Sequence, residues 1–252
     1  MMIYLRFQAD GNHSHYGILE GKTVSEITPN FFGPYKKTGR KYPLSKVKLL
    51  APCQPCKIIA LGLNYLEHIK EMKMSMPLQP LIFLKSPSAL VGPGDNIVSP
   101  SASQRVDYEA ELAVVIKKKA RNVSTRRAPE YILGYTCFND VTARDLQKLD
   151  GQWARAKSFD TFAPLGPWIV DSIDPNKLKI ETLLNGKVKQ RSTTNDLIFK
   201  IDEIISFISG IMTLMPGDII ATGTPPRVGP MLPGDKVEIR IQKIGSLINK
   251  VV

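Results

Sequence analysis

Three acidic residues alternate along one short stretch of this chain: Asp107, Glu109 and Glu111 stand at every second position between Val106 and Ile116. The positions between and beyond them are apolar or aromatic. This is the period of a β-strand, so the pattern predicts one strand with the three carboxylates on one face. Carboxylates at this spacing lie ~7 Å apart and repel by about 2–3 kcal/mol at an effective dielectric of about 20. Either one carboxyl keeps its proton or a cation binds between them, and oxygen ligands suit Mg²⁺ or Mn²⁺. On this stretch alone, a solvated strand edge is the alternative.

A histidine and a glutamate form a second candidate pair. His68 and Glu71 are three positions apart in residues 64–73, a segment with a helical pattern, so they share a helix face and can pair. A carboxylate beside an imidazole orients the ring and raises its basicity. An ordinary surface pair is the alternative interpretation.

Three further segments place polar side chains on an apolar frame, at residues 139–147, 153–160 and 221–225. The first ends a predicted strand and opens a helical turn. The last is a glycine turn whose backbone N–H groups could face an anion. Each of these signals is weak by itself, and the order in which they occur along the chain carries more information.

The elements that must position these residues are mostly short strands. Apolar runs and alternation predict strands at 3–7, 57–63, 81–85, 132–139, 167–170, 178–184, 219–221, 236–241 and 247–251. An apolar stripe predicts a helix over 202–214, and 142–147 has a short helical pattern, whereas 31–43 is rich in Gly, Pro and Lys and predicts a loop. The fold class is therefore α+β and β-rich, a mixed sandwich or roll with short helices. A proline-punctuated junction separates a small N-terminal β-rich segment, residues 1–52, from a larger domain, residues 53–252.

Composition excludes several classes of protein. The 252 residues contain no run of 18 apolar residues, and the N-terminus lacks a secretory pattern, so neither a membrane span nor export is expected. Three cysteines cannot build a disulfide framework, which favours a cytoplasmic location; Cys53 and Cys56 lack the second pair that a zinc site needs. The net charge of +11 lies in short clusters without interleaved aromatics, which favours a solvated surface and attraction for small anions over nucleic-acid binding.

Taken together, these segments resemble the fumarylacetoacetate hydrolase family. The shared motifs run from about residue 50 to the end: G-L-N-Y-x-x-H-x-x-E, I-F-L-K, V-G-P-G-D, V-D-Y-E-A-E-L-A-V-V-I, N-D-V-T-A-R-D-L-Q, A-K-S-F-D-T-F-A-P-L-G-P-W and P-G-D-I-I-x-T-G-T-P. The resemblance implies the roll of this family's C-terminal domain over 53–252, a small N-terminal segment and a homodimer. The family usually follows T-G-T-P with x-G-V-G, and here Arg227 stands where that glycine is expected.

The resemblance also implies roles for ten residues. The metal ligands would be Glu109, Glu111 and Asp140, holding Mg²⁺ or Mn²⁺, with Ca²⁺ possible in crystals. Lys157 is expected beside the metal. The substrate-binding residues would be Lys85, Arg144, Gln147 and Thr224. His68 and Glu71 would form a catalytic dyad on a segment that acts as a lid in relatives.

Members of the family act on 2-oxo and 1,3-dioxo acids. The prediction is a metal-dependent enzyme that cleaves a C–C bond, by hydrolysis or decarboxylation, in an acylpyruvate or oxaloacetate through a metal-stabilised enolate. The alternative within the family is a 2-hydroxyhepta-2,4-diene-1,7-dioate isomerase or decarboxylase. Outside it, the alternatives are a protein that binds anionic surfaces and a relative without activity. The full ligand set and the intact dyad argue against the latter.

Overall fold

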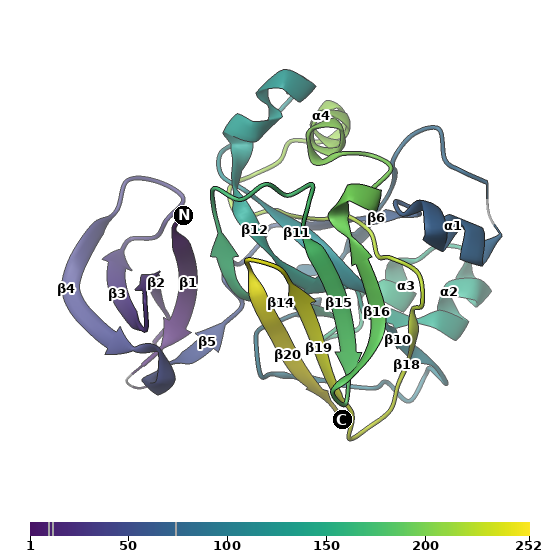
Figure 1. The fold of residues 1–252 in the computed structure, drawn as a ribbon, viewed down its shortest axis with the longest axis horizontal. Helices are drawn as coiled ribbons and strands as arrows, with labels where there is room; N and C mark the ends of the chain where they lie inside the picture. The colour runs from purple at the N-terminus through teal and green to yellow at the C-terminus, as the bar shows by residue number, and fades with distance from the viewer. Residues whose placement is uncertain (10, 12, 74) are drawn as a thin grey trace.

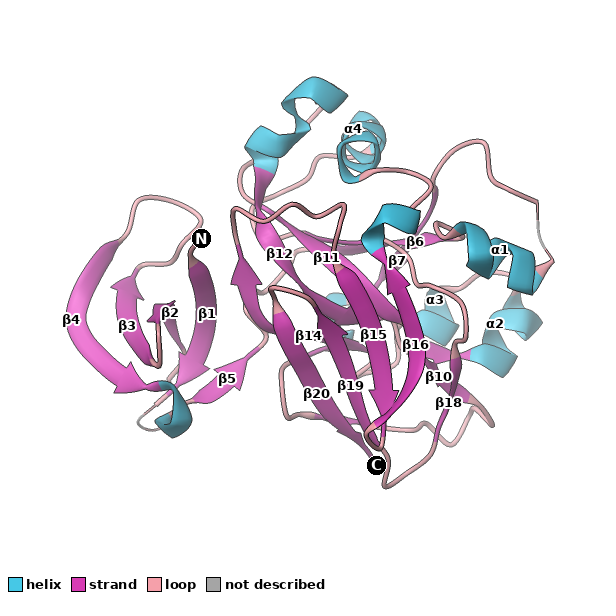
Figure 2. Cartoon of the chain, in the orientation of Figure 1, coloured by secondary structure: helices cyan, strands magenta, loops and turns pink. Residues whose placement is uncertain are grey.

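Strands are the main regular element of this computed structural model, which describes residues 1–9, 11, 13–73 and 75–252 (Figures 1 and 2). The strands are β1 (Ile3–Gln8), β2 (His15–Glu20), β3 (Thr23–Thr28), β4 (Lys36–Pro43), β5 (Lys48–Leu50), β6 (Ile58–Gly62), β7 (Leu81–Lys85), β8 (Leu90–Val91), β9 (Asn96–Ile97), β10 (Val106–Tyr108), β11 (Ala110–Ile116), β12 (Ile132–Asn139), β13 (Thr142–Ala143), β14 (Ala163–Val170), β15 (Lys179–Leu184), β16 (Lys187–Thr193), β17 (Ile219–Ala221), β18 (Gly229–Met231), β19 (Lys236–Ile241) and β20 (Gly245–Val251). The helices are short: α1 (Leu66–Met72), α2 (Arg144–Asp150), α3 (Ala154–Lys157) and α4 (Ile201–Ile211), with 3-10 turns at Leu44–Lys46, Pro87–Ala89, Thr125–Tyr131 and Thr194–Asp196. The β-rich α+β class is confirmed.

One long sheet runs through the molecule in the order β4-β3-β2-β1-β14-β12-β11-β17-β6-β7. The N-terminal strands join it through β1, which pairs antiparallel with β14, so the N-terminal segment extends the sheet of the larger unit. Figure 1 shows these strands, β1 to β5, gathered at one side of the molecule. A shorter sheet of three strands, β13-β10-β18, lies where β11 begins.

A second layer covers the long sheet. Its five strands follow the order β16-β15-β19-β20-β9, and β15, β19 and β20 contact β11, β12 and β14. The core lies between these layers, where side chains such as Leu112, Cys137, Ile239 and Leu247 are fully or almost fully buried. This packing buries β11 and almost all of β12, and both strands lead into the acidic cluster.

The helices occupy the ends and flanks of the sheets. On α4, Ile201, Ile204, Ile205 and Ile208 follow helical spacing and are buried, and the Glu203 side chain accepts a hydrogen bond from the backbone N–H of Lys200 (2.8 Å) at the start of the helix. Helices α1, α2 and α3 gather on the side of the molecule away from the N-terminal strands (Figure 1). In the described part of the chain, no helix is long and apolar enough to cross a membrane.

Two predictions of local structure were wrong. Residues 36–43, expected in a loop, form β4, because β3 supplies a partner strand that the exposed, basic sequence of β4 does not reveal. The strand expected from Val106 to Ile116 is two strands, β10 and β11, which meet at Glu109 and belong to different sheets. The interruption places Glu109 at a corner, where its carboxylate reaches a neighbouring cavity.

Candidate active site

Three buried carboxylates converge where β11 and β12 meet. The two strands pair antiparallel with Ala110 opposite Asn139, the last residue of β12. Glu109 and Glu111 stand on either side of Ala110, and Asp140 comes directly after Asn139, so this register brings the three carboxylates together. Two hydrogen bonds fix the corner: the backbone N–H of Asp140 donates to the carbonyl of Glu109, and the Asn139 side chain accepts from the Glu109 N–H, both at 2.9 Å. One oxygen from each of the three carboxylates lies within 4.8 Å of the other two.

Three cations surround this cluster. The Lys157 ammonium donates to Glu109 Oε2 (3.0 Å) and Asp140 Oδ2 (2.6 Å), and Lys85 donates to Asp140 Oδ1 (2.5 Å). The third cation, Arg144, forms an ion pair with Glu109 and donates from Nε to Asp107 Oδ2 (2.9 Å). Buried charges need such partners, and here each cation has at least one carboxylate.

The protein groups shift the two glutamates in opposite directions. Burial, with the charges of Asp140 and Glu109, raises the pKa of Glu111 well above its usual value. Burial alone would also raise the pKa of Glu109, but Lys157 and Arg144 outweigh it and hold that pKa far below its usual range. Burial would lower the pKa of Lys157, yet Asp140 and Glu109 keep it raised, so this ammonium stays charged.

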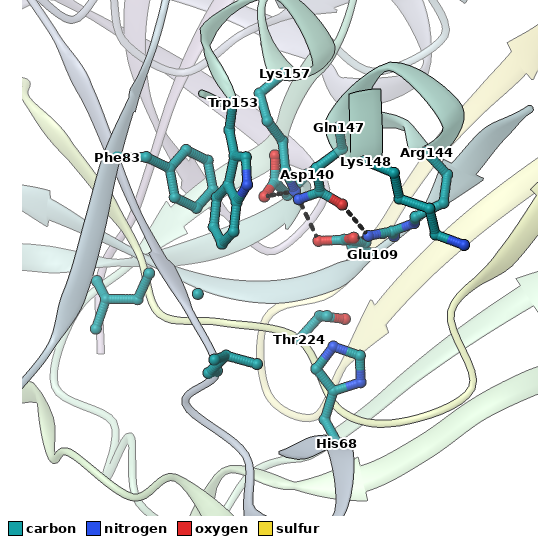
Figure 3. Close-up of a pocket in the computed structure, with 13 residues that line it drawn as sticks. His68, Phe83, Glu109, Asp140, Arg144, Gln147, Lys148, Trp153, Lys157 and Thr224 are labelled. Atoms are coloured by element: carbon teal, nitrogen blue, oxygen red, sulfur yellow. Dashed lines mark hydrogen bonds and ion pairs between the residues drawn. The ribbon is translucent and has the colours of Figure 1, made fainter. Parts of the chain in front are cut away.

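A cavity of about 190 Å³ opens beside the cluster (Figure 3). It is lined by Leu61, Gly62, Leu63, His68, Phe83, Glu109, Asp140, Arg144, Gln147, Lys148, Trp153, Lys157 and Thr224. In Figure 3, His68 and Thr224 lie on one side of the cavity, and Glu109, Asp140 and Lys157 on the other. Drug-sized ligands occupy pockets of about 300–1,000 Å³, so this cavity suits a smaller molecule.

The His68–Glu71 pair forms as its spacing predicts. His68 is buried and its Nδ1 lies 3.3 Å from Glu71 Oε2. If Nδ1 carries the proton and donates to Glu71, Nε2 keeps a lone pair that can accept a proton. Glu71 is itself held by the backbone N–H of Arg227, at 3.0 and 3.2 Å from its two oxygens. The loop that follows β17 therefore fixes the carboxylate that orients His68.

The glycine turn after β17 faces an anion of the protein itself. The Gly223 N–H donates to Glu111 Oε2 (2.8 Å). Next to it, the Thr224 hydroxyl oxygen accepts from Gln190 Nε2 (3.0 Å), which leaves the Thr224 O–H proton available for a ligand in the cavity. The buried Gln190 also accepts from the Ala110 N–H (3.0 Å), so one amide ties this loop to the start of β11, between the two glutamates.

Ten residues were expected at the site, and seven of them line the cavity: His68, Glu109, Asp140, Arg144, Gln147, Lys157 and Thr224. Glu71 pairs with the lining residue His68, and Glu111 belongs to the acidic cluster, but neither of them lines the cavity. Lys85 also lies behind the cavity wall, where its ammonium binds Asp140 and the carbonyl of Val141 (3.1 Å). In this position Lys85 holds Asp140 in place, and its expected contact with substrate stays a prediction. The roles expected for the other nine residues also stay predictions.

Some residues at the site were not foreseen. Lys148 lines the cavity four positions after Arg144, a helical spacing that could have identified it. Phe83 and Trp153 form an aromatic wall, with ring centroids 5.1 Å apart. Gln190 carried no local signal, because it is the one buried residue between exposed neighbours on β16.

Comparison with known proteins settles the relationship of the chain. The model of the fumarylacetoacetate (FAA) hydrolase C-terminal domain matches residues 57–252, and a model described as Rv2993c-like, N-terminal, matches residues 2–52. The chain belongs to the fumarylacetoacetate hydrolase family. The acidic cluster and the cavity both lie within the part matched by the first of these models.

Named relatives in the family carry out different reactions. The chain is 46% identical over 223 residues to the mitochondrial oxaloacetate tautomerase FAHD2A of Bos taurus, covering 83% of this chain and 71% of that one. The crystal structure of 2-hydroxyhepta-2,4-diene-1,7-dioate isomerase from Mycobacterium marinum is 44% identical, with a TM-score of 0.93 over 100% of this chain and 98% of that one. Maleylpyruvate hydrolase from Sphingobium sp. SYK-6, solved with manganese(II) and pyruvate, is 32% identical, with a TM-score of 0.83 over 100% and 99%.

The cluster fits a divalent metal ion. Its three carboxylates are buried and close together, and among the described residues no cation forms an ion pair with Glu111. Oxygen donors of this kind suit hard ions such as Mg²⁺ and Mn²⁺. A family relative was solved with manganese(II). Which ion this chain binds stays a prediction.

The raised pKa of Glu111 can be tested in protein from which a chelator has removed any bound metal ion. Because the folded-state pKa is raised, the folded protein keeps a proton that the unfolded chain releases above about 4.5, the ordinary value for this group. The free energy of unfolding should therefore fall as pH rises above that value. Glu111→Gln cannot titrate, so it should be more stable than wild type at pH 8 and similar to it at pH 4. Urea unfolding at both pH values measures this, and equal differences at the two pH values would contradict it.

The arginine that departs from the family pattern has a backbone suited to glycine. Arg227 has φ 70°, in the left-handed region, and its side chain is exposed. That conformation costs a non-glycine residue about 1–2 kcal/mol. A glycine avoids this cost, but it loses about 0.5–1 kcal/mol more conformational entropy on folding, which offsets part of the gain. Arg227→Gly should thus raise the free energy of unfolding by roughly 0.5–1 kcal/mol. Arg227→Ala keeps the strained backbone and is the matched control. A gain as large in the alanine variant would show that the side chain, not the backbone, is responsible.

Proposed function

We propose that this protein is a metal-dependent enzyme that moves a proton at the carbon beside the ketone of a small 2-oxo acid, with oxaloacetate as the model substrate. The observation that carries the proposal is the position of His68, whose ring faces Glu109, Asp140 and Lys157 across a cavity of about 190 Å³. A base thus stands on one side of a small molecule and fixed charge on the other. The tautomerase and isomerase relatives, whose printed names describe isomerisations, support this reading.

Glu109, Glu111 and Asp140 would hold the ion. A divalent ion at these oxygens acts as a Lewis acid that stabilises negative charge on an oxo group. Lys157 adds a fixed positive charge on the same side, since its ammonium lies on both Glu109 and Asp140. Because the three carboxylates stand on or directly beside the packed strands β11 and β12, and Lys157 is held by two of them, little reorganisation is needed during the reaction.

His68 is the general base in this proposal. Its Nε2 removes the proton from the carbon beside the ketone and returns a proton when the ketone re-forms, while Glu71 holds the ring in place. The Thr224 hydroxyl and the Gln147 amide are donors for the substrate carboxylate: Gln147 uses its oxygen to accept from Arg144 (2.7 Å), which leaves its NH₂ group for the cavity. The rings of Phe83 and Trp153 limit the access of water.

The proposal can be tested with purified protein and oxaloacetate. In the presence of Mg²⁺ or Mn²⁺, we expect faster keto–enol interconversion, followed by ultraviolet absorbance of the enol, and faster exchange of the C3 protons in D₂O, followed by NMR. Because free metal ions also act on oxaloacetate, the reference is the same metal with no protein. Rates equal to that reference with both ions would overturn the proposal.

Cleavage of a C–C bond is the second candidate. The same His68–Glu71 pair that removes a proton from carbon could activate a water molecule to attack the distal carbonyl of an acylpyruvate. The relative named maleylpyruvate hydrolase favours this reaction. Hydrolysis releases pyruvate and a second carboxylic acid, and decarboxylation of oxaloacetate releases pyruvate and CO₂. Measuring pyruvate in the same assays separates both from tautomerisation, which converts the ketone into its enol and forms no pyruvate.

A further inference from the structure

Helix α2 places three polar side chains at the cavity from one face. Arg144, Gln147 and Lys148 stand at positions i, i+3 and i+4 of the helix, and all three line the cavity. Figure 3 shows Lys148 beside Arg144. The three side chains differ in how many of their hydrogen-bonding groups already bind other protein groups. This difference suggests a separate role for Lys148.

The cations nearest the acidic cluster are committed to protein groups. Lys157 lies on Glu109 and Asp140, and Arg144 binds two carboxylates and the oxygen of Gln147. Lys148, by contrast, has no hydrogen bond or ion pair with any residue that the structure describes, and no dashed line reaches it in Figure 3. It is exposed, so it stands at the mouth of the cavity and not in its depth.

The charge of the inner site explains why a second cation at the mouth matters. The four acidic groups Asp107, Glu109, Glu111 and Asp140 are matched by four cations, Lys85, Arg105, Arg144 and Lys157, so the formal charge is balanced before any ion binds. A divalent ion would add two positive charges, which the carboxylate and the developing enolate oxygen at the 2-oxo end of a substrate would neutralise. A second carboxylate on the same molecule needs a further cation. Lys148 lines the cavity and pairs with no carboxylate among the residues that the structure describes.

We infer that Lys148 binds the distal carboxylate of a 2-oxo dicarboxylic acid and makes the site selective for diacids over monoacids. The inference rests on the proposed function and goes further by naming the substrate class. The 2-oxo end lies toward the acidic cluster and Lys157, and the distal end points to the mouth beside α2. In a cavity of about 190 Å³ such a substrate is short, of the size of oxaloacetate.

The test compares one diacid with one monoacid. The substrates are oxaloacetate and acetylpyruvate, both of which form enols, and the quantity is the ratio of their kcat/KM values for keto–enol interconversion. Lys148→Met should lower this ratio roughly tenfold, mainly by raising the KM for oxaloacetate, because a charge-assisted contact at a partly exposed position is lost. Lys148→Glu should lower it further, and Lys148→Arg should restore most of it.

Ionic strength gives a second measurement that a purely structural role would not affect. Salt screens exposed charges, so the wild-type ratio should fall as NaCl is raised, whereas the ratio of Lys148→Met should change little. Lys119 is the matched control: it is exposed, has no partner in the described part of the chain, and lies beyond the far end of β11 from the cavity. Lys119→Met should keep the wild-type ratio.

The outcomes separate this inference from the proposed function. If wild type is active on both substrates and Lys148→Met keeps the wild-type ratio, the inference is wrong and the proposed function stands. The same conclusion follows if wild type prefers acetylpyruvate, or if Lys119→Met lowers the ratio as much as Lys148→Met. If wild type accelerates neither reaction beyond metal alone, the proposed function fails, and the substrate class assigned to Lys148 fails with it.

Discussion

Replacing Glu111 by alanine should remove metal-dependent turnover almost completely while the fold survives. The variant lacks one of the three proposed oxygen ligands. Loss of a single preorganised electrostatic group typically costs about 10²–10³-fold in rate, so we expect a fall of at least about 10³-fold when the ion itself is bound poorly. Glu111 is a better choice than Glu109 for this experiment. Removing Glu109 would leave Arg144 and Lys157 with fewer carboxylates in a buried site.

Glu111 has weaker ties to the protein. Its carboxylate accepts a hydrogen bond from the Gly223 N–H, and neighbouring negative charge already raises its pKa. Circular dichroism should therefore show an intact fold in Glu111→Ala, and calorimetry should show weak or absent binding of Mn²⁺. Glu130→Ala, which removes an exposed glutamate paired with Arg127, is the matched control and should keep both activity and metal binding. Wild-type turnover in Glu111→Ala would refute the assignment of this residue as a ligand.

Much of the fold can be predicted because its signals are local. Strands β12, β17 and β19 begin and end at the residues that the apolar runs predict, and the turn at Asn185-Gly186 joins β15 to β16. The isoleucine stripe of α4 is buried as its spacing predicts. In each case, the pattern that identifies the element is also the pattern that packs it against the core.

The errors arise where distant segments decide the structure. β4 is a strand because β3 pairs with it, and nothing within residues 36–43 indicates that pairing. The break at Glu109 depends on β10 pairing with β13 and β18, while β11 pairs with β12 and β17. An alternating sequence is equally consistent with one strand or with two that change sheets.

The same distinction applies to the site. The spacing of His68 and Glu71 predicts a contact within one helix, and the contact is present. Residue spacing alone could not bring Asp140 to Glu109, since that contact depends on the register of β11 and β12, and it was expected only because the motifs resemble a known family. Gln190, which joins the Thr224 loop to Ala110, had neither kind of signal.

His68→Ala should lower kcat by roughly 10²–10⁴-fold, the usual contribution of a positioned general base. His68 is the histidine that lines the cavity, and the three carboxylates proposed to bind the metal lie on other segments, so metal affinity should not change. Glu71→Ala should have nearly the same effect, because without this carboxylate the ring loses its orientation. The double variant should be little worse than either single one, since the two residues act as a unit.

The chain supplies a matched control for this experiment. His15 and Glu26 form a second histidine–glutamate pair (Nδ1 to Oε1, 3.1 Å) on β2 and β3, in the N-terminal strands and away from the cavity. His15→Ala removes the same side chain and should leave kcat at the wild-type value. Steady-state kinetics on the best 2-oxo acid, with Mn²⁺ binding measured in parallel, decides the matter. If His68→Ala turns over as fast as His15→Ala, another group moves the proton, and the base must be sought among the remaining groups that line the cavity.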